Sequence, residues 1–153
     1  MKSTTLETIG QIVNGLSLAA LFFLATVLDL PAPPPLVQAL AWALFAVGML
    51  LLLLSVGALM RNRGKGLIGR GVYGLVRHPM YVGAIILFLS WILFLPHWIT
   101  LIIALGNAAI VYWHILQGER RNIEIFGCEY KTYMKSVPRA NLFAGLLRRL
   151  RGV

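Results

Sequence analysis

Two short stretches of the sequence concentrate the residue types that could bind a charged ligand. The first is Arg77-His78-Pro79-Met80-Tyr81, where an apolar run begins. Proline suits the first position of a helix, because its missing N–H would be unpaired there in any case. A helix N-terminus carries partial positive charge, so with Arg77 and His78 beside it this one could bind a carboxylate or a phosphate. The alternative is structural, with Arg77 extending to lipid phosphates.

The second stretch follows the apolar run 98–116. Glu119 comes just after it, with arginines next in the chain. A carboxylate among arginines is usually one half of a salt bridge, but near a buried site it can hold an ammonium or hydroxyl group. Asn107, His114 and Arg121 fall seven residues apart and therefore share one helix face. We expect interhelical hydrogen bonds from Asn107 and His114 rather than catalysis.

Two further patterns are interpreted as structural. Gly69-Arg70-Gly71-Val72-Tyr73-Gly74 fits the G-x-G-x-x-G dinucleotide pattern, which is meaningful only between a strand and a helix. No strand is predicted before it, so the glycines are expected to let a surface loop turn back and approach another segment closely. Cys128 is the single cysteine, which excludes an intramolecular disulfide, a cysteine-based zinc site and a CxxC redox pair. No metal site is predicted.

The composition identifies the solvent in which these residues must be positioned. Of 153 residues, 59% are hydrophobic and only 12% are charged, and the mean hydropathy is +0.80. A soluble domain carries about 25% charged residues. Uncharged runs of roughly 18 or more residues are long enough to cross a bilayer as helices. The sequence therefore predicts an all-α integral membrane protein with about four transmembrane helices, at 8–28, 36–60, 80–95 and 98–116.

The connections complete the predicted topology. Four prolines in the segment 29–35 form a short external turn, and Pro96-His97 joins the last two spans into a helical hairpin. We expect the first span to be retained, since its apolar core is too long for a signal peptide. The loop 61–79 carries the first motif. A cytoplasmic helical segment, 117–153, completes a single domain over residues 1–153.

Small residues and charges refine this arrangement. The pairs Gly15/Ala19 and Ala39/Ala43 are spaced for close helix packing in lipid. All 14 Lys and Arg fall on one side of the predicted spans, which places both termini and the motif loop in the cytoplasm and the protein in the inner membrane. The net charge of +9 is thereby explained without a nucleic-acid partner.

The tail after residue 140 has its own pattern. Leu142, Phe143, Leu146, Leu147 and Leu150 recur at helical spacing beside arginines, in a segment suited to lie in the plane of the lipid headgroups. We expect this tail to anchor the C-terminal segment at the membrane surface.

The two charged stretches also carry a family resemblance. The segment 71–83 is similar to the G-x-Y-x-x-x-R-H-P-x-Y-x-G signature of the isoprenylcysteine carboxyl methyltransferase and phospholipid methyltransferase superfamily. The segment 119–139 is similar to that superfamily's E-x-x-N, F-G-x-x-Y-x-x-Y and V-P-R stretches, in the same order. One departure is that many members have a Glu-Glu pair where this chain has Gly118-Glu119, so the role of the first acid is absent or performed elsewhere.

The resemblance implies an integral-membrane methyltransferase that binds S-adenosylmethionine from the cytoplasm, in a pocket between the last two helices and the C-terminal segment. The cofactor-site residues that it implies are Tyr73, Arg77, His78, Tyr81 and Glu119. The candidate catalytic residues are Glu119 and Arg139. The residue types agree with this role, because Arg77 and His78 could bind the carboxylate of the cofactor and Glu119 its ammonium group. Tyr81 could supply an aromatic slot.

Three questions stay open at the level of sequence. The lipophilic acceptor could be the carboxylate of a prenylated cysteine-like group, a phospholipid amine, a small thiol or an isoprenoid, and the oligomeric state is not specified. A sterol-type NADPH-dependent reductase also contains R-H-P-x-Y, although this chain has Met80 and Ala84 where such reductases commonly have Asn and an acid. A non-enzymatic basic protein that binds anionic lipid is the remaining alternative.

Overall fold

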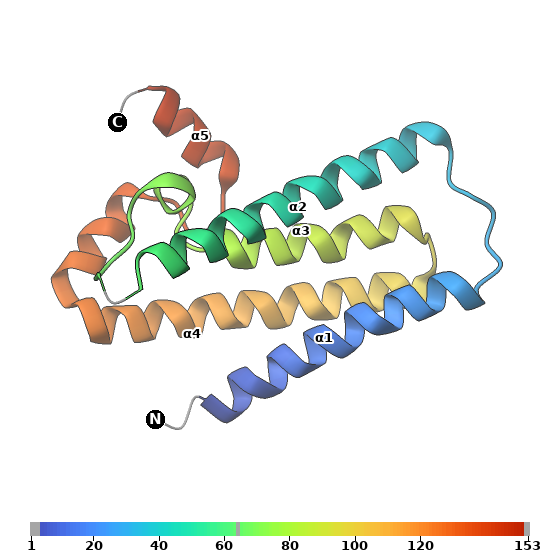
Figure 1. Cartoon of the computed structure of the whole chain (residues 1–153), viewed down its shortest axis with the longest axis horizontal. Coiled ribbons are helices and arrows are strands. Elements are labelled where there is room, and N and C mark those ends of the chain that lie inside the picture. Colours follow the sequence, from blue (N-terminus) through green and yellow to red (C-terminus); the bar gives the residue numbers. More distant parts are fainter. Residues whose placement is uncertain (1–3, 64, 152–153) are drawn as a thin grey trace.

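The computed structural model describes residues 4–63 and 65–151, and this part of the chain is helical without strands (Figure 1). Lys2 and Gly64 lie outside the described residues. The elements in chain order are α1 (Thr4–Val27), α2 (Pro35–Arg61), the short 3-10 helix η1 (Gly71–Gly74), α3 (Pro79–Phe94), α4 (Trp98–Ser136) and α5 (Leu142–Leu150). The prediction of an all-α fold is confirmed.

Three of the helices, α1, α2 and α4, are long and apolar enough to cross a membrane. Their outer faces expose large apolar side chains such as Leu16 at 66%, Phe23 at 65% and Leu53 at 64%. Such surfaces are stable against lipid rather than water, so the protein is an integral membrane protein. α3 is apolar but has 16 residues, which extend about 24 Å. The count of four complete spans therefore stays a prediction.

The fourth helix extends beyond its predicted membrane span. It continues from the span 98–116 into the charged segment, which was predicted to be helical, and reaches Ser136. Charged residues end a membrane span without ending a helix, because Glu, Lys and Arg are good helix formers. Gly127 interrupts α4 with φ of 54°, in the left-handed region that favours glycine, and so bends its last two turns.

The helices form a bundle in which α2 packs mainly against α3, α3 also packs against α4, and α1 lies against α4 (Figure 1). The closest approach of α2 and α3 is at Gly48 and Gly83. A Cβ atom on Gly83 would lie 2.7 Å from the Gly48 carbonyl oxygen. The predicted packing pairs Gly15/Ala19 and Ala39/Ala43 are wrong in this respect, because those four residues are exposed.

The chain after α4 folds back onto the loop that precedes α3. The Arg77 amide donates to the Pro138 carbonyl oxygen at 3.0 Å. Ala140 and Leu142 pack against a buried cluster that includes Val76. α5 then crosses the loop with Gly145 so close to the Leu75 carbonyl that no side chain could fit. The motif loop is thus held between the bundle and the C-terminal segment.

Candidate active site

Glu119 is the centre of a buried charge cluster at the end of the bundle where the loop meets α4. Its side chain is 6% exposed. Oε1 lies 3.0 Å from Arg77 Nη2 and 3.5 Å from His78 Nε2. Oε2 accepts hydrogen bonds from Arg139 Nε at 2.9 Å and lies 2.8 Å from Arg139 Nη2. The four residues that sequence reasoning placed in two separate stretches therefore meet around one carboxylate.

Local structure explains why these four side chains converge. His78 is the N-cap residue of α3 and Pro79 occupies the first helical position, as predicted. Arg77 is fixed one residue earlier by its backbone hydrogen bond to Pro138. That bond also places Arg139, the next residue after Pro138, beside the same loop. Glu119 reaches both from the middle of α4, one turn beyond the predicted span.

The cluster has an excess of positive charge. Two guanidinium groups face one carboxylate. Burial lowers the pKa of His78 to about 4, and the charge of Arg77 lowers it further while Glu119 opposes the shift. His78 is therefore neutral near pH 7. Hydrogen bonding to Glu119 raises the pKa of Arg139, so that side chain stays charged. An excess of one positive charge around buried Glu119 suits a ligand that brings a carboxylate.

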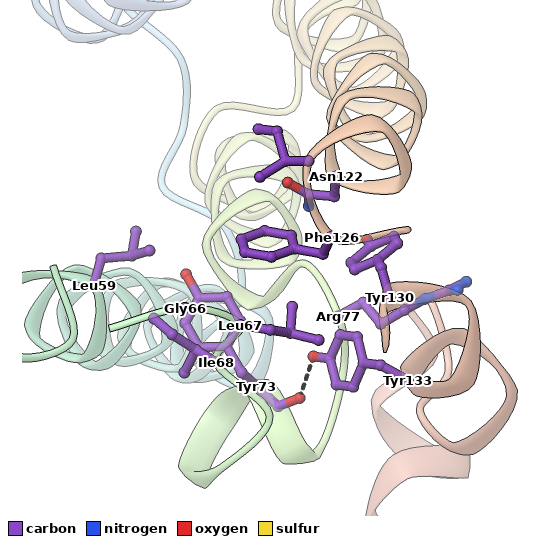
Figure 2. Close-up of a pocket in the computed structure, with 11 residues that line it drawn as sticks. Leu59, Gly66, Leu67, Ile68, Tyr73, Arg77, Asn122, Phe126, Tyr130 and Tyr133 are labelled. Atoms are coloured by element: carbon purple, nitrogen blue, oxygen red, sulfur yellow. Dashed lines mark hydrogen bonds between the residues drawn. The ribbon is translucent and has the colours of Figure 1, made fainter. Parts of the chain in front are cut away.

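A cavity of about 280 Å³ adjoins the cluster, and Arg77 belongs to its wall (Figure 2). Leu67, Ile68 and Tyr73 line it from the loop, and aromatic residues line it from α4. In Figure 2 the Tyr133 hydroxyl points to the loop, where it donates to the Tyr73 carbonyl oxygen at 2.5 Å. The cavity thus combines an aromatic and aliphatic lining with the edge of a charged cluster.

Of the predicted site residues, Tyr73 and Arg77 line this cavity, whereas His78, Glu119, Arg139 and Tyr81 do not. Tyr81 also makes no ion pair or hydrogen bond with Glu119 in the described part of the chain. Its ring is 6.0 Å from that of His78 and stacks on His114 at 6.3 Å. α1 approaches the same place, because a Cβ atom on Gly10 would lie 2.3 Å from His114 Nε2. Tyr81 therefore connects the charge cluster to the contact between α1 and α4.

The other polar residues of α4 have structural positions. Asn107 and His114 are buried, but Asn107 Nδ2 donates to Ile103 within its own helix. The predicted interhelical hydrogen bond of Asn107 is therefore not made by this donor, because the carbonyl one turn earlier is within reach. Arg121 lies at the surface and pairs with Glu7 of α1 at 2.8 Å.

Sequence reasoning missed several residues of the cavity. Asn122, Phe126 and Tyr130 follow one another at a spacing of four in the segment predicted to be helical, and this spacing is the signal that could have placed them on one helix face. Tyr112 was missed as well. Its hydroxyl accepts from Arg139 Nη1 at 3.3 Å, because Arg139 folds back along α4. Nothing in the local sequence signals that contact.

The comparison with known families agrees with this geometry. The family model described as phospholipid methyltransferase matches residues 36–127, which is more than half of the chain. The chain belongs to the phospholipid methyltransferase family. The resemblance seen in the two motif stretches is thereby confirmed, and the protein is a membrane methyltransferase.

The limits of the match divide the site into two parts. The family-matched residues run from the start of α2 to the bend at Gly127 and include Arg77, His78 and Glu119. Arg139 and Tyr133 lie beyond the matched residues, so the family match does not cover them and their roles are assigned from their contacts in the structure. No curated protein and no solved structure matches the chain.

Proposed function

We propose that this phospholipid methyltransferase family member transfers the methyl group of S-adenosylmethionine to a lipophilic acceptor that enters from the bilayer. The observation that carries the proposal is Glu119, buried between Arg77, His78 and Arg139 beside an aromatic cavity. Because Arg139 and the family-matched residues contribute to one cluster, we further propose that residues 1–153 act as a single domain.

The buried donors and acceptors of the cluster fit the amino-acid end of such a donor molecule. Arg77 is 9% exposed, and its Nε and Nη1 atoms have no hydrogen-bond partner among the described residues. These buried donors remain after the ion pair of Arg77 with Glu119, and an unpaired buried N–H suits an anionic group such as a carboxylate. Glu119 Oε1 lies 3.0 Å from Arg77 Nη2 in an ion pair but accepts no hydrogen bond within the same part of the chain, so it can accept one from an ammonium group.

The cavity fits the remaining parts of the donor. Tyr73, Phe126, Tyr130 and Tyr133 offer aromatic faces against which a flat heterocycle or a sulfonium cation is favourably placed. When bound, S-adenosylmethionine supplies an activated methyl group: its sulfur–methyl bond breaks as the bond from the acceptor atom to the methyl carbon forms, and a neutral thioether leaves.

The residues of the chain would contribute position and a dry environment rather than covalent chemistry. Glu119 would orient the donor through its ammonium group while Arg77 holds the carboxylate, which fixes the direction of the methyl group. Because the transfer redistributes charge, excluding water from the site strengthens these interactions. We assign Glu119 a catalytic role in this sense.

Arg139 has the best position to meet the acceptor. Its guanidinium is shared between buried Glu119 and Tyr112, which is 44% exposed on the outer surface of α4. A carboxylate or phosphate of a lipophilic acceptor could pair with Arg139, whereas an amine acceptor must lose a proton before or during transfer. This arrangement favours donor entry from the cytoplasm and acceptor entry from the membrane, with both termini in the cytoplasm.

Calorimetric titration of S-adenosylhomocysteine, the product of the donor, into detergent-purified protein tests the proposal. Glu119→Gln and His78→Ala are expected to weaken binding, whereas Glu124→Gln, an exposed carboxylate on the same helix, is the matched control and is expected to bind as wild type does. Absence of binding to folded wild type in both detergent and lipid would refute the assignment of the donor.

The acceptor is tested separately with methyl-labelled S-adenosylmethionine. Vesicles containing phosphatidylethanolamine and micelles containing a farnesylated cysteine analogue present an amine and a carboxylate in turn. Labelling of one lipid extract assigns the acceptor class. If neither is labelled while S-adenosylhomocysteine binds, both acceptor classes are refuted and the donor assignment stands.

A further inference from the structure

A groove distinct from the aromatic cavity also borders the motif loop. It has a volume of about 490 Å³ and is formed by the last turns of α2, by η1 and by α5. Its apolar wall includes Leu53 and Leu54 of α2 and Leu75 beyond η1. None of its lining residues lines the cavity beside Glu119. The groove is therefore a separate feature of the surface.

Two cations stand at the polar end of this groove. Arg61 is in the last turn of α2, and Arg149 is in the last turn of α5. Both are exposed. Arg149 Nη1 reaches the Gly71 carbonyl oxygen only at 3.5 Å. No carboxylate is among the lining residues, so this pair of positive charges has no counterion there.

The apolar wall continues onto the outer surface of the bundle. Leu53 is 64% exposed and Leu54 is 47% exposed, on a helix that is apolar enough to span the membrane. In such a setting the wall faces acyl chains, and the two arginines stand where that wall ends in the charged loop. An apolar wall that contacts acyl chains, with two cations at its end, is complementary to a phospholipid with an anionic headgroup.

We propose that this groove is a binding site for one anionic phospholipid, with its phosphate between Arg61 and Arg149 and an acyl chain along Leu53 and Leu54. The site does not depend on the identity of the methyl donor, and it is distinct from the acceptor path beside Arg139. An electrically neutral phospholipid lacks the net charge that two unpaired arginines favour, so the site selects phosphatidylglycerol over phosphatidylcholine.

A lipid bound in this groove would also stabilise the position of the motif loop. Arg148, the neighbour of Arg149, donates to the Gly74 carbonyl oxygen, and Gly145 packs on Leu75. α5 therefore connects the groove to the loop that carries Arg77. The exposed side chains of Phe143 at 81% and Leu150 at 76% give α5 further contact with lipid.

The test measures which lipids stay bound to the protein. Wild type is reconstituted in vesicles of equimolar phosphatidylglycerol and phosphatidylcholine and solubilised in mild detergent, and the retained lipids are quantified by mass spectrometry. Arg61→Gln combined with Arg149→Gln is expected to lower the retained ratio of the two lipids by about tenfold or more. The control, Arg63→Gln with Arg151→Gln, removes the same charge from exposed positions that do not line the groove.

A second variant blocks the acyl chain without changing charge. Gly57 lines the groove and has nothing within 4 Å of an added Cβ atom, so a longer side chain can start there and Gly57→Leu is expected to occupy the groove. It is expected to reduce retained phosphatidylglycerol. Gly106→Leu is the matched control, because Gly106 also faces open space but lies on α4.

The outcomes separate a built site from general attraction to charge. Loss of phosphatidylglycerol in the groove variants with retention in both controls supports the site. Equal loss in the two double-arginine variants would mean that net charge alone attracts the lipid, and it would overturn the proposal. Equal retention of the two lipids by wild type would overturn it as well.

Discussion

Removing the charge of Glu119 should destabilise the protein more than removing the charge of either arginine that contacts it. Glu119→Gln keeps the shape of the side chain but leaves Arg77, whose side chain is 7% exposed, as a buried cation without a counterion. Breaking a buried ion pair in this way costs about 3–5 kcal/mol of unfolding free energy. The remaining amide oxygen still accepts hydrogen bonds, so we expect about 3 kcal/mol.

The two arginine variants provide the internal comparison. Arg77→Gln leaves Glu119 paired with Arg139 at 2.8 and 2.9 Å, so its carboxylate stays compensated and the cost should be about 1–3 kcal/mol. Arg139 has a side chain that is 38% exposed, and solvent weakens its contribution. Arg139→Gln should therefore cost about 1 kcal/mol or less.

The free energies of unfolding are measured by denaturant titration in mixed micelles, and the double variant Glu119→Gln/Arg77→Gln closes a thermodynamic cycle. Because it removes the uncompensated cation, it should cost less than the sum of the single variants. Two results would refute the reasoning: a cost for Arg139→Gln equal to that for Glu119→Gln, or additive single and double variants.

Three further predictions concern His78, Gly83 and Tyr133. The pKa of His78 is lowered from 6.5 to about 4 on folding, so the unfolded chain binds more protons between these pH values. The free energy of unfolding should therefore fall by about 3 kcal/mol as the pH drops through this window. His78→Gln should reduce that pH dependence in unfolding measured at several pH values, and an unchanged slope would refute the linkage. Gly83→Ala forces α2 and α3 apart at the Gly48 backbone and should lower the unfolding free energy by about 1–3 kcal/mol, whereas Gly106→Ala, which enters open space, should not; equal effects would contradict this packing. Tyr133→Phe removes the hydrogen bond to the Tyr73 carbonyl and should cost about 1 kcal/mol in the same assay, and no change would mean that the bond contributes nothing.

The spans and the charge cluster could be predicted from sequence for different physical reasons. The uncharged runs predict helices because the backbone in lipid must bond within its own segment. The bounds of α1, α2 and α3 accordingly fall within a few residues of the predicted runs. Family resemblance implied that Arg77 and Glu119 belong to one site, but it did not predict their ion pair, because residues 42 positions apart give no local signal of contact.

Helix contacts could not be predicted in the same way. Spacing by four residues identifies a face that permits close packing, but it does not say which face meets another helix. Gly15 satisfies the spacing and faces open space, whereas Gly48 and Gly83 lie on different helices and form a close backbone contact between α2 and α3. The choice is made between two helices at once, and such a pairing is absent from the pattern of either helix alone.

The aromatic side of the candidate site depends on the bend at Gly127. The sequence shows Asn122, Phe126, Tyr130 and Tyr133 at helical spacing, yet they line one cavity on both sides of a residue with positive φ. An uninterrupted helix would direct the last turns along the axis of α4, whereas the bend lets Tyr133 reach the Tyr73 carbonyl. The family match also ends at this residue. The residues that contact the motif loop from the C-terminal side therefore lie beyond the family match, and Arg139 reaches Glu119 from that part of the chain.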